Sequence, residues 1–133
     1  MTAIGAFHHL GVACRNLERE RSAYAQLGYE PEGDEFDDPG HGIRGVFLTG
    51  PGPRLELVVA RPGSAVLEPW LSSGSTVYHL AYETDDLTGA VDAQRHAGAK
   101  LVVAPRPAVA FGGRSVAFVM LRTRMLVELI SRA

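Results

Sequence analysis

The chain has 133 residues, 46% of them hydrophobic, and a formal net charge of −2 at pH 7. This length predicts one compact domain, residues 1–133, and the near-neutral charge argues against a nucleic acid or an anionic membrane surface as partner. No stretch approaches the roughly 20 apolar residues of a membrane span, and we find no targeting segment at the N-terminus. The single cysteine, Cys14, excludes an intramolecular disulfide. We therefore expect a cytoplasmic protein in which Cys14 is a small buried hydrophobe.

The sequence resembles itself at an offset of 70 residues, which predicts an internal duplication. The matching segments are 7–13 with 77–83, 27–29 with 97–99, 44–48 with 114–118 and, after two additional residues in the second hairpin, 54–58 with 126–130. The register holds over almost a whole module, which chance similarity rarely does.

Both copies predict the same order of elements. The first strand covers about 6–13 and leads to a helix that begins after Asn16 and ends at Gly28, because an asparagine caps free N–H groups and a glycine adopts the left-handed end conformation. The strands that follow in this module are expected at about 29–36, 44–49 and 54–60. In the second module the helix lies between Asp85-Asp86 and Gly98, and the later strands are expected at about 100–104, 114–121 and 125–131.

These elements give a module one of about 6–60, a connector of 61–76 with a turn or two of helix, and a module two of about 77–131. A βαβββ unit cannot bury one face of its sheet alone. We therefore predict an α+β fold in which two βαβββ modules form a half-open barrel, with helices outside and a cup within.

Polar residues interrupt the apolar strands at matching positions. Side chains alternate across a strand, so Glu56 faces away from its apolar neighbours Leu55 and Leu57, and Glu128 does the same in the second module. A carboxylate in such a strand is costly to bury unless it is paired or binds a cation. His9 and His79 occupy matching positions on the first strand of each module.

Two imidazoles and two carboxylates suit a divalent metal such as Zn²⁺, Ni²⁺, Co²⁺ or Mn²⁺. The repeat brings the two pairs toward one point, so we predict a metal site whose ligands are His9, Glu56, His79 and Glu128. The neighbouring His8 matches a tyrosine and is not expected to be a ligand. In the alternative interpretation the histidines are core residues, and the glutamates pair with arginines such as Arg44 and Arg114.

The sequence resembles the vicinal oxygen chelate superfamily, which contains glyoxalases, bleomycin resistance proteins and extradiol dioxygenases. The resemblance rests on the segments His9–Ala13, Leu27–Tyr29, Leu55–Leu57, 112–114 and 126–129, and it is strongest toward methylmalonyl-CoA epimerase-like proteins. It implies a glyoxalase-like fold and a metal-ligand pattern of His, Glu or Gln, His, Glu, which falls on the four residues already selected. Members of this superfamily often form homodimers, and we expect one here.

The resemblance also implies a reaction, the transfer of a proton next to a metal-bound carbonyl in a small carbonyl compound or thioester. In this pattern Glu128 lies at the metal and takes part in the transfer. A second acid usually precedes the third strand, but this chain has Gly40 at that position. The next residue, His41, could replace it, since an imidazole titrates near neutrality, or it could be an exposed loop histidine.

The segment 105–114 is expected to border the cup. Arg106 and Arg114 could bind an anionic ligand and Phe111 could cover an apolar one, or the segment could be an ordinary surface hairpin. Two other functions stay open. One is a small-molecule binding protein of the antibiotic-resistance type without catalysis. The other is a ring-cleaving dioxygenase, which a fourth protein ligand at Glu56 disfavours because it would occupy a position that oxygen needs.

Overall fold

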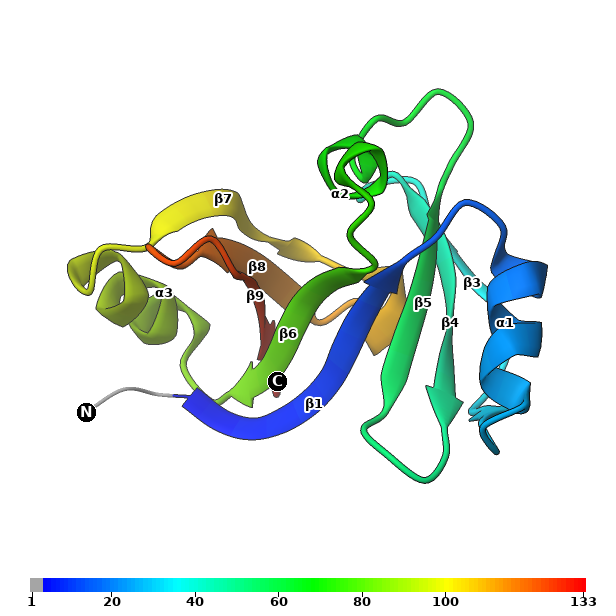
Figure 1. The fold of residues 1–133 in the computed structure, drawn as a ribbon. Helices are drawn as coiled ribbons and strands as arrows, with labels where there is room; N and C mark the ends of the chain where they lie inside the picture. The colour runs from blue at the N-terminus through cyan, green and yellow to red at the C-terminus, as the bar shows by residue number, and fades with distance from the viewer. Residues whose placement is uncertain (1–3) are drawn as a thin grey trace. The chain divides into compact units, whose positions relative to one another are not determined.

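The structure is a computed structural model, and it describes residues 4–133 (Figure 1). These residues form two compact units: residues 9–78, called the first unit, and residues 4–8 together with 79–133, called the second unit. The strand β1 (Ile4–Ala13) is therefore divided, with Ile4–His8 in the second unit and the rest in the first. Within the described residues no helix is long and apolar enough to span a membrane.

The first unit combines a mixed sheet with two helices. Its sheet follows the order β2-β4-β5-β1, β3 also pairs with β4, and only the β1–β5 pairing is parallel. The elements are α1 (Leu17–Ala25), β2 (Glu30–Pro31), β3 (Phe36–Asp38), β4 (Ile43–Thr49), β5 (Leu55–Ala60) and α2 (Glu68–Ser73).

The second unit repeats this arrangement with a longer outer strand. Its order is β1-β6-β9-β8-β7, where β6 and β9 are parallel and the β9–β8 and β8–β7 pairs are antiparallel. The elements are β6 (Val77–Thr84), whose first two residues belong to the first unit, α3 (Leu87–His96), β7 (Lys100–Pro107), the short 3-10 helix η1 (Val109–Phe111), β8 (Ser115–Met120) and β9 (Leu126–Ser131).

The predicted helix ends are confirmed. The side chain of Asn16 accepts a hydrogen bond from the backbone N–H of Arg19 at 2.9 Å, and that of Asp86 accepts one from Gly89 at 3.0 Å. Gly28 and Gly98 follow the two helices with φ of +97° and +99°, a conformation that costs glycine little. The predicted helical turn in the connector is α2.

The predicted strand at 29–36 is wrong as one element, because the structure has β2 and β3 separated by residues 32–35. The N–H of Glu32 still donates to the Phe47 carbonyl at 2.8 Å, after which the pairing with β4 stops at Gly33, which has no side chain to pack, and begins again at Phe36. The predicted strand at 100–104 is too short. β7 continues to Pro107 through two register shifts.

Each unit packs its long helix against the apolar face of its own strands. In the first unit, α1 contributes Leu17 to a core that also contains Val12, Cys14, Val46, Leu48, Leu55, Leu57 and Val59. In the second unit, α3 contributes Ala90 and Val91 to a core that also contains Ala117, Val119, Val127 and Leu129. The apolar alternation of β5 and β9 therefore turns the intervening glutamates to the opposite face, which is the face that carries the candidate site.

Candidate functional site

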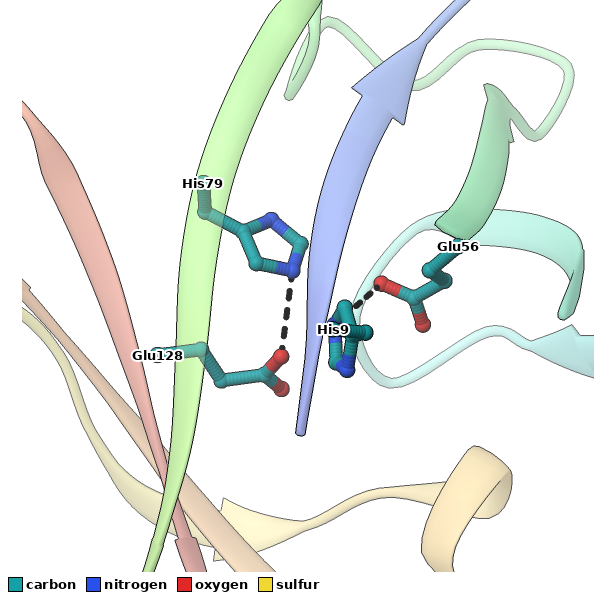
Figure 2. Close-up of side chains that lie close together, drawn as sticks. All are labelled: His9, Glu56, His79 and Glu128. Atoms are coloured by element: carbon teal, nitrogen blue, oxygen red, sulfur yellow. Dashed lines mark ion pairs between the residues drawn. The ribbon is translucent and has the colours of Figure 1, made fainter. Parts of the chain in front are cut away.

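In the first unit, His9 and Glu56 form a buried pair. Glu56 lies across from Gly11 in the β1–β5 ladder, so His9, two residues earlier on β1, shares its face. The Nε2 atom of His9 lies 3.2 Å from Oε1 of Glu56, and the two residues are 0% and 4% exposed (Figure 2). This confirms that the strand alternation turns both polar groups to the face opposite the α1 core.

In the second unit, His79 and Glu128 repeat this pair. The β6–β9 ladder places Ala81 across from Glu128, so the histidine again precedes the partner of the glutamate by two residues. The Nε2 atom of His79 lies 3.1 Å from Oε1 of Glu128, and the residues are 1% and 4% exposed (Figure 2). The duplication predicted from the sequence thus produces the same local geometry twice.

A phenyl ring packs against the histidine of each pair, and we did not predict this from the internal repeat of the sequence. Phe47 on β4 lies directly across from Glu56, and its ring packs edge-on against His9 with centroids 5.2 Å apart. Phe118 on β8 lies directly across from Glu128, and its ring packs against His79 at 5.4 Å. Each imidazole is therefore held between a carboxylate and a phenyl ring.

This equivalence corrects the register that we predicted between the third strands of the modules. Sliding the sequence by 70 residues places Phe47 over Ala117, whereas the structure makes Phe118 its counterpart. The offset is thus 71 residues at the third strand and 72 at the fourth. One of the two additional residues lies before β8, and only one lies in the hairpin between β8 and β9.

The spacing within each pair suits a shared cation. Nitrogen and oxygen ligands lie about 2.0–2.2 Å from Zn²⁺, so neighbouring ligand atoms around one ion lie roughly 3.0–3.5 Å apart. The observed 3.1 and 3.2 Å fall in this range, and they are also hydrogen-bond distances when no ion is bound. Imidazole and carboxylate are suitable donors for a divalent transition metal. Each pair therefore fits half of a ligand set.

The arginines considered as partners for these glutamates have other partners. Arg44 lies 3.6 Å from Glu35, and Arg114 lies 3.4 Å from Glu83. The carboxylates that these arginines face are thus Glu35 and Glu83, while Glu56 and Glu128 contact the two histidines.

The surroundings of His8 differ from those of its neighbour His9. It is half-buried, and its ring packs against Phe111 with centroids 5.3 Å apart. Phe111 is itself buried, and the guanidinium of Arg114 lies 5.7 Å from the centre of its ring. Arg114 also donates to the backbone oxygens of Phe111 and Ser131. These contacts account for how Phe111 and Arg114 are held, and their role toward a ligand stays a prediction.

Arg106 lies on the face of the second unit that carries Glu128. It pairs with Val116 on β8, Val116 pairs with Ile130 on β9, and Ile130 is two residues from Glu128. Paired residues share a face of a sheet, so the register is consistent with the predicted position of Arg106 beside the site. Its side chain is exposed.

His41 lies in the turn between β3 and β4. Its backbone N–H donates to the carboxylate of Asp38 at 3.1 Å and to the Asp38 carbonyl at 3.2 Å, and its side chain is half-buried. Gly40 is exposed in the same turn. Asp38 is a buried carboxylate that we did not predict from the sequence, and it lies between Asp37 and Pro39 at the end of β3.

Comparison with known proteins gives one consistent result. Residues 8–118 match the profile of the Glyoxalase/Bleomycin resistance protein/Dioxygenase superfamily. Among curated proteins, the chain is 29% identical over 119 residues to the ethylmalonyl-CoA/methylmalonyl-CoA epimerase of Cereibacter sphaeroides, which covers 86% of this chain and 87% of that protein.

Solved structures of epimerases share the fold. The methylmalonyl-CoA epimerase of Mycobacterium tuberculosis superposes with a TM-score of 0.81 at 23% identity, covering 100% of this chain and 91% of that one. A variant of the Streptomyces coelicolor methylmalonyl-CoA epimerase, in complex with 2-nitronate-propionyl-CoA, gives a TM-score of 0.79 at 26% identity, covering 98% and 96% of the two chains.

Proposed function

Because the chain belongs to the glyoxalase/bleomycin resistance protein/dioxygenase superfamily, we propose that it is a metal-dependent epimerase that moves a proton at the carbon next to a thioester carbonyl. The substrate class follows from the relatives, which are epimerases of acyl-CoA thioesters by name. The strongest support from this chain itself is the repeated His–Glu–Phe arrangement, in which two buried pairs have the same spacing and the same aromatic neighbour.

We propose further that both pairs serve one divalent ion, with His9, Glu56, His79 and Glu128 as its ligands. A single pair offers one nitrogen and one carboxylate, which is fewer than the three or four protein ligands of typical zinc sites. Two repeat-equivalent pairs supply four. Zn²⁺, Ni²⁺, Co²⁺ and Mn²⁺ all accept this donor set, and the ion is to be identified by elemental analysis.

When bound, the ion would polarise the thioester carbonyl and lower the cost of removing the neighbouring proton. Glu128 is the proposed base, since a carboxylate oxygen can accept the proton from the α-carbon. Epimerisation also needs a donor on the opposite face of the planar intermediate, and His41 is the candidate in this chain. Phe47 and Phe118 exclude water from one side of each imidazole and fix its orientation.

Metal content tests the shared site. His9→Ala and His79→Ala should each remove most of the bound metal, about one ion per chain in the wild type, because one imidazole and two carboxylates hold a divalent ion more weakly than the full set of four ligands. His8→Ala is the matched control, with the same chemical change at the next residue, and should leave occupancy unchanged. If each histidine variant lost only half of the metal that the wild type binds, the two pairs would be independent sites. If His8→Ala lost as much metal as these variants, the ligand assignment would be overturned.

Isotope exchange tests the chemistry. Incubation of the metal-loaded protein with methylmalonyl-CoA in D₂O should place deuterium at the α-carbon and interconvert the two epimers. The second candidate, a protein that binds a small molecule without catalysis, is favoured by the glycine at position 40, where the family pattern has an acid. Binding of the thioester without exchange in the metal-loaded protein would support that candidate and reject the epimerase.

A further inference from the structure

Four exposed basic residues gather at one end of the second unit, where α3, β7 and the β8–β9 hairpin meet. Arg95 is in the last turn of α3, and Lys100 begins β7, where it pairs with Met120 at the end of β8. Arg122 and Arg124 lie in the hairpin between β8 and β9. We call Arg95, Lys100, Arg122 and Arg124 the basic patch.

Short contacts hold these segments together. A side-chain carbon on Gly98 would overlap Cδ of Arg122, so the arginine lies directly on the turn that follows α3. The N–H of that glycine donates to the carbonyl oxygen of Arg95 at 3.0 Å. The helix end, the start of β7 and the hairpin therefore form one corner of the unit.

The positive charge of the basic patch is not neutralised within the unit. None of its four residues forms an ion pair with a carboxylate in the part of the chain that the structure describes, whereas Arg114 and Arg132 face Glu83 and Asp85 at 3.4 and 3.5 Å. This corner is thus locally positive in a chain whose net charge is −2, and a local field of this kind attracts anions.

The backbone of Arg124 gives a second, independent indication. Its φ is +79°, a left-handed conformation that is uncommon for residues other than glycine. Glycine adopts this backbone conformation without strain, but the chain has an arginine, with a long cationic side chain, at this position. Such strain is found more often where a side chain serves a function than elsewhere.

We propose that the basic patch binds the phosphate groups of coenzyme A, an inference that rests on the proposed thioester substrate. Arg124 lies in the hairpin four residues before Glu128 on β9, so the Cα atoms of the two residues are at most about 14 Å apart. The pantetheine arm is a long flexible chain between the thioester carbonyl and the phosphates, and it spans such a distance. Arginine side chains bind phosphate oxygens with two parallel hydrogen bonds, which suits Arg122 and Arg124 to this role.

The test compares two double variants with the same change in charge. Arg122→Gln/Arg124→Gly removes two cations of the basic patch and places glycine where φ is positive. Arg19→Gln/Arg132→Gln removes two exposed cations elsewhere. By calorimetry, the patch variant should bind coenzyme A about tenfold more weakly than the wild type, and the control should bind like the wild type.

The salt dependence of binding and a ligand without phosphate provide two further tests of the phosphate site. Raising NaCl from about 0.05 M to about 0.3 M should weaken coenzyme A binding to the wild type more than to the patch variant. The N-acetylcysteamine thioester of methylmalonate, which has no phosphate, should show equal kinetics in all three proteins. Unchanged affinity of the patch variant for coenzyme A would overturn the proposal. The proposal would also be overturned if the wild type bound pyrophosphate as tightly as it binds coenzyme A.

The outcomes separate this proposal from the proposed reaction. If coenzyme A binds through the basic patch but no deuterium enters a thioester, the epimerase proposal fails and the phosphate site stands. If deuterium enters the N-acetylcysteamine thioester while the patch variant binds coenzyme A normally, the phosphate site fails and the epimerase stands.

Discussion

Phe47 on β4 lies directly across an antiparallel strand pair from Glu56 on β5, and its ring packs edge-on against the imidazole that the glutamate contacts. Phe118 has the same relationship to Glu128 and His79. Edge-to-face packing of this kind is worth about 0.5–1.5 kcal/mol and prefers one ring orientation. The phenyl rings therefore fix the direction of the two Nε2 atoms.

Phe47→Leu and Phe118→Leu should each weaken metal binding by about tenfold, because residues that orient a ligating histidine typically contribute 10–100-fold to affinity. Competition with a chelator of known affinity measures the effect. Phe7→Leu is the control, since Phe7 is 45% exposed and packs only at the periphery against Tyr82. Normal affinity in both site variants would mean that the rings serve packing alone.

Gly40→Glu should increase α-proton exchange with methylmalonyl-CoA, because it places a carboxylate where the family pattern has its second acid. Gly40 is exposed and is not among the glycines of residues 4–133 with positive φ, so its backbone conformation is one that residues with a side chain also adopt. Deuterium incorporation followed by mass spectrometry measures the rate, with Gly33→Glu as a control in another exposed loop. No gain over wild type would indicate that His41 already supplies the second group, or that one base suffices.

The Cys14 thiol should be almost unreactive in the folded protein. It packs in the core of the first unit, donates to the carbonyl of Val58 at 3.4 Å, and burial together with the Glu20 carboxylate raises its pKa from 9.0 to about 11. At pH 8 only about one thiol in a thousand is then ionised, so alkylation should be slow and should accelerate about tenfold per pH unit.

The same shift in pKa affects stability. The folded protein keeps the neutral thiol, so its contribution is fully present below pH 9 and is lost as the pH rises toward 11. Urea titrations at several pH values should show the free energy of unfolding falling over this range, and the fall should be smaller in Cys14→Ala. An equal decline in both proteins would contradict the assignment.

Arg124→Gly should raise the free energy of unfolding by about 1 kcal/mol, because a residue with a side chain at φ +79° carries a steric cost that glycine avoids. Urea denaturation measures the change. The carbonyl of Leu121 accepts the Arg124 N–H at 2.8 Å, and this bond is kept in the variant. A loss of stability would show that the arginine side chain itself supports the hairpin.

The sequence predicted those parts of the fold that depend on local chemistry. The two long helices begin after Asn16 and Asp86 and end before Gly28 and Gly98, as expected, because capping and left-handed helix ends need particular residue types. The pairing of His9 with Glu56 followed from strand alternation and the repeat.

The sequence could not predict what depends on the pairing register between strands. A loop insertion changes the length of the chain without revealing its position, so Phe118 was matched to the wrong residue until the ladder with β9 was known. The break between β2 and β3 was not predicted for a related reason. The residues before Pro31 and those after Gly33 are both compatible with a strand, and only the pairing with β4 shows where hydrogen bonding stops.

The two His–Glu–Phe sets differ in the lengths of the loops around them but not in their internal geometry. The loops thus differ in length between the two halves, while the imidazole, the carboxylate and the ring are the same in both. Under the proposed function each half alone would carry half of a ligand set, so the loops of either half can change in length without removing a ligand.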